Sequence, residues 1–290
     1  MEALSRPSGP FVSLPALVQR QARLKPVVCL ETTPPRNRAD WCRTLDLASR
    51  ARPWIEFTTM TDTGSSRGDP ATQAAIQLRL ATGRPVIAHV ACAGQTQDDL
   101  SRRVEALLEG HVDHVLVLRG DVTPKSGGFT HADEAIAFLR RRYPRLVIGA
   151  ACYPCGHPDD GELGQDIRTM QRKAQAGADF FVSQIVLDHA RFRDHVIAAA
   201  RAGIRVPILP GISVVGSLAR LEKVAAHCRF GIPDELRRVC DGQSENYFLR
   251  QMVGTARAAW VHGAPGIHLC PFNNPDLTIR FLLALFGYNV

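Results

Sequence analysis

The sequence predicts a single (β/α)8 barrel of 290 residues. Eight short apolar runs rich in β-branched residues alternate with stretches of helical length. The runs are apolar almost throughout, as is typical of strands covered on both faces in a parallel sheet. Eight strand–helix units over roughly 260 residues match the usual size of such a barrel. The competing open, doubly wound sheet normally carries a glycine-rich loop after its first strand, where this chain has Glu-Thr-Thr-Pro-Pro-Arg.

We expect residues 1–290 to form one barrel domain whose elements follow in strict alternation. The predicted strands are 27–31, 54–59, 85–92, 114–118, 147–152, 180–184, 206–210 and 266–270. The predicted helices are 39–51, 70–82, 96–110, 131–143, 164–176, 189–202, 217–227, 246–262 and 276–286. Gly110, Gly177 and Gly203 stand where helices commonly end. Two additions are expected, an N-terminal helix at 14–24 and an insertion at 230–245 between strands seven and eight.

Composition limits the class of protein. A hydrophobic fraction of 45% with 22% charged residues is typical of a folded domain and excludes a disordered chain. No apolar run approaches the ~20 residues needed to span a bilayer, and the first residues do not resemble a secretory signal. Eight cysteines are too few for a disulfide scaffold of this length. We therefore expect a cytoplasmic protein with reduced thiols.

The net charge of +7 points to anionic partners. Aromatic residues make up only 7% of the chain and the arginines are scattered, whereas nucleic-acid readers usually cluster both. A phosphorylated small ligand explains the charge as well, so we expect neither a nucleic-acid nor a membrane partner.

Polar residues gather where the predicted strands end, which is where barrels carry their functional groups. Each strand ends in, or is followed by, a polar residue or glycine. In chain order these are Glu31; Thr59, Thr61 and Asp62; His89; Arg119, Gly120 and Asp121; Tyr153 and His157; Gln184; Gly211; and Asn273 and Asn274. We expect them to converge on one mouth of the barrel.

Glu31 is the strongest single candidate. It directly follows the apolar run Val-Val-Cys-Leu, so partial desolvation should raise its pKa and suit it to general acid catalysis. The alternative is a carboxylate at the barrel rim paired with an arginine.

Three other groups have both a functional and an ordinary interpretation. Cys152 and Cys155, with His157 nearby, could begin a zinc site or a redox pair. Zinc would need a further ligand, no second cysteine pair has this spacing, and Cys228 and Cys240 are only loose candidates, so we predict no metal. Arg172 and Lys173 could reach phosphates or form a solvated helical face, and Asp121 could cap an ordinary loop.

At these residues the chain resembles the methylenetetrahydrofolate reductase family, in its bacterial-type, flavin-dependent catalytic barrel. The resemblance runs from about residue 27 to the C-terminus. It rests on ordered motifs: LETTPPR at 30–36, with threonines where the family usually has aromatic residues; AHVAC at 88–92; LRGD at 118–121; YP at 153 and HP at 157; Asp166, Arg172, Lys173 and AGA at 176–178; SQ at 183; and LPGI at 209–212.

The resemblance implies a barrel that binds FAD non-covalently and reduces 5,10-methylenetetrahydrofolate to 5-methyltetrahydrofolate with NADH or NADPH. In it, Glu31 corresponds to the general acid and Asp121 to a carboxylate near flavin and pterin. The FAD-contacting positions are Thr61, His89, Arg119, Gly120, Asp121, Tyr153, His157, Asp166, Arg172 and Lys173. Gln184 corresponds to a folate-contacting position.

The chain departs from the family pattern at three positions of the substrate region. Asp62 stands in place of a tyrosine, Arg220 in place of a glutamine and Asn274 in place of an arginine. Arg220 and Asn274 are retained as candidate substrate residues. The expected partners are a folate and a nicotinamide nucleotide, with the chain assembled as a homo-oligomer.

Other functions remain open from the sequence. A paralogue could act on another C1-pterin adduct or in the oxidative direction. A flavin- or folate-binding subunit could depend on a partner for its electrons, and a zinc-dependent methyl carrier is a third class.

Overall fold

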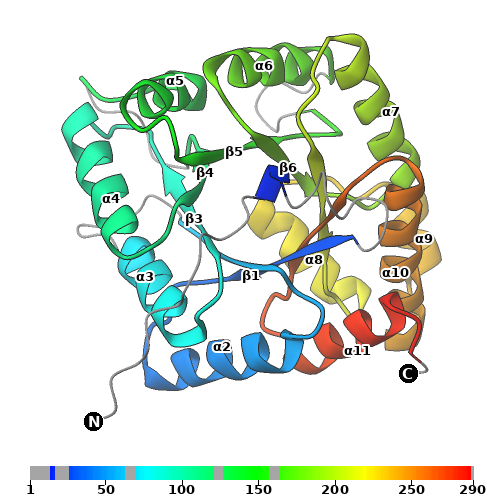
Figure 1. Ribbon diagram of the computed structural model, residues 1–290. Helices are drawn as coiled ribbons and strands as arrows, with labels where there is room; N and C mark the ends of the chain where they lie inside the picture. The colour runs from blue at the N-terminus through cyan, green and yellow to red at the C-terminus, as the bar shows by residue number, and fades with distance from the viewer. Residues whose placement is uncertain (1–13, 17–25, 63–69, 121–126, 157–162, 289–290) are drawn as a thin grey trace.

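The computed structural model describes residues 14–16, 26–62, 70–120, 127–156 and 163–288. Its eight strands are all parallel and close into a barrel in the order β1 to β8. Helices surround the strands as an outer ring (Figure 1). The predicted (β/α)8 fold is therefore confirmed.

The elements lie close to their predicted bounds. The strands are β1 (Val27–Thr32), β2 (Phe57–Met60), β3 (Val86–Ala91), β4 (His114–Leu118), β5 (Val147–Cys152), β6 (Phe180–Ile185), β7 (Ile208–Ser213) and β8 (Gly266–Cys270). The helices are α2 (Arg38–Ala51), α3 (Pro70–Thr82), α4 (Gln97–Glu109), α5 (Ala132–Arg142), α6 (Leu163–Ala176), α7 (His189–Arg201), α8 (Leu218–Cys228), α9 (Asp234–Cys240), α10 (Glu245–Val261) and α11 (Pro275–Leu285).

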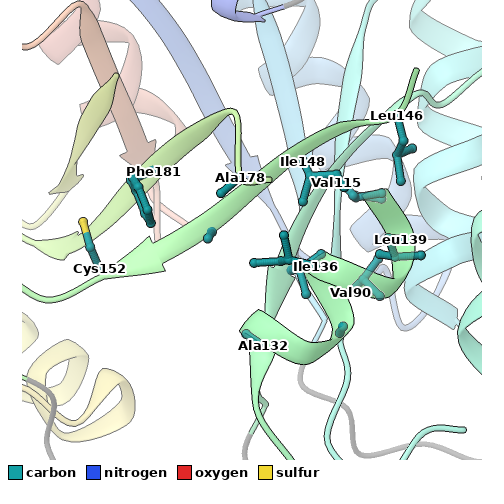
Figure 2. Close-up of a cluster of buried hydrophobic side chains, with 14 of the residues drawn as sticks. Val90, Val115, Ala132, Ile136, Leu139, Leu146, Ile148, Cys152, Ala178 and Phe181 are labelled. Atoms are coloured by element: carbon teal, nitrogen blue, oxygen red, sulfur yellow. The ribbon is translucent and has the colours of Figure 1, made fainter. Parts of the chain in front are cut away.

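Alternation along the strands separates the interior of the barrel from the layer under the helices. In β4, Leu116 belongs to the interior cluster, while Val115 and Val117 belong to the outer one. Figure 2 shows part of the outer cluster, where Ile136 and Leu139 of α5 lie among strand residues such as Val115. Both strand faces are covered by apolar side chains, which explains the almost uninterrupted apolar runs in the sequence.

Bulky residues fill the end of the barrel opposite the candidate mouth. The interior cluster consists of Val27, Cys29, Phe57, Ile87, Leu116, Phe180, Val182 and Leu209, together with Leu14 from the N-terminal stretch. The backbone N–H of Leu14 donates a hydrogen bond of 3.1 Å to Nε2 of the buried His114. Residues 14–16, drawn in dark blue within the ring of helices in Figure 1, therefore pack against this end of the core. The remainder of the helix predicted at 14–24 lies outside the described residues.

Two strands differ from the prediction by more than one residue at an end. β2 begins at Phe57 rather than at residue 54, because Trp54 and Ile55 pack against a second core cluster outside the barrel. β7 continues to Ser213, so Gly211 lies within it rather than after it. A side chain at Gly211 would bring Cβ to 2.7 Å from the Ser183 carbonyl oxygen, so only glycine allows β6 and β7 to approach this closely.

The predicted insertion at 230–245 contains one short helix, α9. Among the described residues, none of the helices combines the length and the apolar character required to cross a membrane.

The seam between β8 and β1 generates a prediction about stability. A Cβ added to Gly266 would lie 2.0 Å from the Val27 carbonyl oxygen, so Gly266→Ala must push apart the two strands that close the barrel. We expect a loss of about 1–3 kcal/mol in the free energy of unfolding, measured by urea denaturation.

The matched control is Gly254→Ala in α10, where a Cβ would meet nothing within 4 Å. Alanine should there raise the free energy of unfolding by about 0.5–1 kcal/mol through helix propensity. Similar effects of the two substitutions would contradict the assigned role of Gly266 in the seam.

Candidate active site

Four adjacent strands bring a compact group of polar side chains together at one mouth of the barrel. Glu31 comes from β1, Thr59 from β2, His89 from β3 and His268 from β8. One carboxylate oxygen of Glu31 and one ring nitrogen each of His89 and His268 all lie within 4.8 Å of one another. Of the residues expected to converge at the mouth, Glu31, Thr59 and His89 therefore do so on this side of the barrel.

Hydrogen bonds link this group into a chain. The Thr59 hydroxyl oxygen lies 3.0 Å from Nε2 of His268, and Nδ1 of the same ring lies 3.6 Å from the Cys270 sulfur. A carboxylate oxygen of Glu31 lies 3.9 Å from Nε2 of the same His268 ring. No arginine in the described part of the chain forms an ion pair with Glu31, so the rim-pair alternative does not apply to these residues.

Burial controls the charges of the group. Desolvation raises the pKa of Glu31 to about 7, and the hydrogen bond from Cys270 opposes this rise. Desolvation also lowers the pKa of His89 to about 4 and that of His268 to about 3. At neutral pH both imidazoles are thus uncharged, while Glu31 is partly protonated. This is the property required of a general acid or base.

The ligand atoms of Glu31, His89 and His268 lie close enough together to hold a metal ion, whereas the sequence predicts no metal. The His268 nitrogen that faces Glu31 is already within hydrogen-bonding distance of Thr59. Elsewhere Cys152 is buried, Cys155 is exposed and neither forms a disulfide. His157, the third member of the suggested zinc site, lies outside the described residues, and the expected absence of a metal stays a prediction.

His89 has an unused hydrogen-bonding atom. The side chain is buried, and its Nε2 has no hydrogen-bond partner within the part of the chain that the structure describes. A buried imidazole nitrogen without a partner is costly, which makes it a suitable contact for a bound ligand.

Asp62 has a structural role that explains one departure from the family pattern. Its carboxylate accepts a hydrogen bond of 2.9 Å from the Ala91 N–H and pairs with Arg103 at 2.8 Å. The two side chains of this pair are only 8% and 11% exposed. Asp62 therefore fastens the end of β2 to β3 and α4. The backbone N–H of its neighbour Thr61 donates to the Thr32 carbonyl at 2.9 Å.

The loop after β4 is described as far as Gly120. Arg119 is exposed, and Gly120 adopts a φ of +86°. A Cβ at Gly120 would lie 2.8 Å from the Cβ of Ala91, so this position favours glycine on both counts. Asp121 lies outside the described residues.

Asp166 and Lys173 support the loop after β5 from beneath. The Asp166 carboxylate accepts a 3.1 Å hydrogen bond from the Tyr153 N–H, and Nζ of Lys173 donates to the Ala151 carbonyl at 2.7 Å. Both are buried, and desolvation raises the pKa of Asp166 to about 6. Arg172 is instead half exposed and pairs with Asp133 of α5 at 3.2 Å.

A cavity of about 440 Å³ lies on the other side of the mouth. It is lined by residues 153–156, Gln184 to Asp188, Arg191 and residues 229–233, which include the predicted site residues Tyr153 and Gln184. Nε2 of Gln184 donates to the Cys228 carbonyl at 3.1 Å, which fixes the amide beside the cavity. The lining is mainly apolar, as ligand cavities usually are.

The remaining candidates, Arg220 and Asn274, hold the loop after β8. Asn274 caps α11 by accepting a hydrogen bond from the Leu277 N–H, and the Arg220 guanidinium donates to the Phe272 carbonyl. The loop between them is tight, with positive φ at Phe272 and Asn273. Their contacts are thus with the chain itself, and their role toward substrate stays a prediction.

Three buried residues of the region were missed by the sequence interpretation of the site. His268 and Cys270 are spaced by two in a strand, so they share a face and could have been recognised from that spacing. His195 of α7 is fully buried, 3.8 Å from the Asp166 carboxylate, and nothing in the local sequence distinguishes it from a surface histidine on a helix.

A sequence profile of the family described as methylenetetrahydrofolate reductase matches residues 17–285. The 5,10-methylenetetrahydrofolate reductase of Escherichia coli (strain K12) is 30% identical over 176 residues, 60% of this chain and 58% of that one. The enzyme of the same name from Pectobacterium carotovorum subsp. carotovorum is 28% identical over 279 residues, 91% of this chain and 90% of that one. The alignment thus spans little more than half of the first relative and nearly all of the second.

Solved structures share the fold. An uncharacterised protein from Clostridium thermocellum that binds two copies of 5-methyl-5,6,7,8-tetrahydrofolic acid superposes with a TM-score of 0.69 at 16% identity, over 93% of this chain and 97% of that one. An oxaloacetate acetylhydrolase in complex with oxalate reaches a TM-score of 0.56 at 13% identity, over 98% and 90%. At such low identities these likenesses support the barrel alone.

The raised pKa of Glu31 predicts how stability depends on pH. Between 4.5 and about 7 the folded chain retains a proton at Glu31 that the unfolded chain has released. The contribution of Glu31 to the free energy of unfolding is therefore largest below pH 4.5. It decreases by about 3 kcal/mol in total as the pH rises to about 7.

Glu31→Gln removes this titration and keeps the shape of the side chain. Between pH 5 and pH 8 the free energy of unfolding of the wild type should therefore decrease relative to that of the variant. Urea denaturation of both proteins at the two pH values measures this difference. An identical pH dependence of the two proteins would show that Glu31 titrates normally in the folded chain.

Proposed function

The chain belongs to the methylenetetrahydrofolate reductase family, and we propose that it reduces 5,10-methylenetetrahydrofolate to 5-methyltetrahydrofolate with NADH or NADPH, in two half-reactions through FAD. The observation that carries this proposal is Glu31, a carboxyl with a pKa of about 7 at the mouth of the barrel. The proposal includes small-molecule partners only, a cytoplasmic location and a homo-oligomeric assembly.

The described residues offer contacts that suit FAD. The partnerless Nε2 of His89 provides a hydrogen-bonding atom, and Gly120 keeps the loop after β4 free of a side chain. The exposed Arg119 carries a positive charge at the same loop. We propose these residues, with Thr61 and Tyr153, as the FAD contacts, supported by Asp166, Arg172 and Lys173. Asp121 and His157 are proposed for the same site from the family resemblance.

FAD, when bound, supplies the acceptor and donor of hydride that no amino-acid side chain provides. The chain supplies the proton. Glu31 donates it to the ring nitrogen of the folate that leaves when the five-membered ring opens, which produces a cationic iminium on the substrate. We propose that the Asp121 carboxylate stabilises this cation electrostatically and that Gln184 positions the folate.

Uncharged neighbours suit Glu31 to this role. Protonated imidazoles beside Glu31 would stabilise its carboxylate form and so lower its pKa. Burial keeps His89 and His268 neutral, since their pKa values are lowered to about 4 and about 3. Glu31 thus remains available as a proton donor near neutral pH.

The first test is the visible spectrum of the purified full chain. It should be yellow as isolated or take up one equivalent of added FAD. Anaerobic NADH or NADPH should bleach the flavin band, and methylenetetrahydrofolate should restore it. A chain that binds no FAD contradicts the proposal, whereas FAD binding without bleaching would indicate a flavin-binding subunit that depends on another electron donor.

The second test separates the half-reactions. Glu31→Gln should bleach with NAD(P)H at the wild-type rate but reoxidise with the folate about 10²–10⁴-fold more slowly, because only that step requires the proton. Stopped-flow absorbance on both half-reactions measures this directly. Equal slowing of the two would show that Glu31 is not the acid.

A further inference from the structure

The Glu31 carboxylate and the rings of His89 and His268 together have the composition of a metal centre. One carboxylate oxygen and one nitrogen of each ring lie within 4.8 Å of one another. We propose that these three side chains bind a divalent transition-metal ion, Zn²⁺ in particular, at the mouth of the barrel. The metal site is independent of the proposed function, whereas its effect on FAD binding rests on that function.

The three ligands come from separate parts of the sequence. The closed barrel brings them together, because β8, β1, β2 and β3 are successive neighbours in it. Side chains carried on strands are held more precisely than side chains on loops, so the spacing of the ligands is fixed before an ion binds. The sequence-based prediction of no metal considered the cysteines near residue 152 and did not involve these side chains.

The donor atoms determine which metal the site would take. Two imidazole nitrogens and one carboxylate oxygen are a set found in catalytic zinc sites. Ca²⁺ and Mg²⁺ prefer oxygen ligands alone, so two histidines argue against either ion. Three protein ligands leave a coordination position for water. The Glu31 side chain is 19% exposed, which gives the ion a route from the solvent.

The unsatisfied nitrogen of His89 is an independent sign that this group binds something. The side chain is only 6% exposed, and its Nε2 has no hydrogen-bond partner in the described part of the chain. Burial of such an atom costs free energy unless a ligand binds it. The ring centroids of His89 and His268 are 6.1 Å apart, so a metal ion between the rings would supply the missing partner.

His268 has the support expected of a metal ligand. Its Nδ1 lies 3.6 Å from the Cys270 sulfur, and histidines that bind metals are normally oriented by a contact of their other nitrogen. Nε2, 3.9 Å from the Glu31 carboxylate, is then the atom that faces the ion. The Thr59 hydroxyl lies 3.0 Å from this nitrogen and can rotate away from it, so one neutral hydrogen bond is exchanged for a metal–imidazole bond.

The ion also supplies the positive charge that Glu31 lacks. Within the described ranges no arginine pairs with this carboxylate, and buried charges in proteins are normally paired or bound to metals. Two ligand atoms on one tetrahedral zinc are about 3.4 Å apart, so the 3.9 Å between Glu31 and His268 must shorten by about half an ångström. Small rotations about the side-chain bonds of Glu31 are enough for this.

The experiment is a calorimetric titration of the purified, metal-free and FAD-free full chain with Zn²⁺. The wild type should bind one equivalent. Glu31→Gln, His89→Gln and His268→Gln should each weaken binding by more than about 100-fold, because loss of an outer-shell partner alone costs about 10–100-fold. Glu31→Gln keeps the shape of the side chain, so it decides the matter if a histidine variant does not fold. Equal affinities of Glu31→Gln and the wild type would overturn the proposal.

Two controls address adventitious binding. Cys42 and Cys155 are exposed thiols, and the exposed His189 stacks on His262 with ring centroids 5.7 Å apart. The double variant Cys42→Ser/Cys155→Ser and the single variant His189→Ala should both bind Zn²⁺ as tightly as the wild type. Loss of binding in either control with retention in Glu31→Gln would assign the ion to the surface and overturn the proposal, as would a wild type that binds no zinc.

Competition with FAD separates this inference from the proposed function. Zn²⁺ and FAD both require the free nitrogen of His89, so they should exclude each other. With Zn²⁺ at 100 times its dissociation constant, the apparent dissociation constant of FAD should rise about 100-fold in the wild type, measured by flavin absorbance. If zinc binds with the expected ligand dependence but leaves FAD affinity unchanged, the metal site stands and the assignment of His89 to FAD is wrong. If FAD binds and zinc does not, the metal site alone is wrong.

Discussion

Closure of the sheet between β8 and β1 is the constraint on which the candidate site depends. Glu31 lies near the start of the chain and His268 near its end, and the pairing of β1 with β8, from Val27–Gly266 to Leu30–Leu269, brings their strands together. The seam is tight because a glycine faces the Val27 carbonyl there. The core cluster at the opposite end holds the strands in register. The positions of the site residues are therefore set by the packing of a cluster to which none of them belongs.

Desolvation is the second organising effect, and it acts on acids and bases in opposite directions. It raises the pKa of Glu31 and lowers that of the two histidines, so the same apolar surroundings produce a protonatable acid beside two neutral imidazoles. Among the described residues, neither histidine beside the acid therefore carries a positive charge at neutral pH. Asp62 and Arg103 show the contrasting arrangement, because their charges are compensated within a buried pair.

The sequence predicted the fold well because strand burial and helix ends are local properties. β4, β5 and β8 match their predicted bounds, since an apolar run and its flanking residues suffice to define them. β7 was predicted at 206–210, two residues early at its start and three residues short at its end. The end was missed because glycine is unusual inside a strand, and the close approach of β6 explains why Gly211 continues this one. Desolvation after an apolar run raises the pKa of Glu31 as expected. His268 and Cys270 were not selected, although their spacing by two places them on one face of β8.

The departures at Asp62, Arg220 and Asn274 illustrate a limit of aligning motifs. Each aligned with a position near substrate in the family, yet each side chain is bonded to its own chain: Asp62 to β3 and α4, Arg220 to the loop after β8, and Asn274 to the start of α11. A substitution at an aligned position therefore changes the support of a loop as well as its chemistry. Because the loop after β8 follows directly on Cys270, altered support there acts on the same strand that carries His268, which lies 3.9 Å from the Glu31 carboxylate. Arg220 and Asn274 thus support the loop that follows β8 through contacts within the chain.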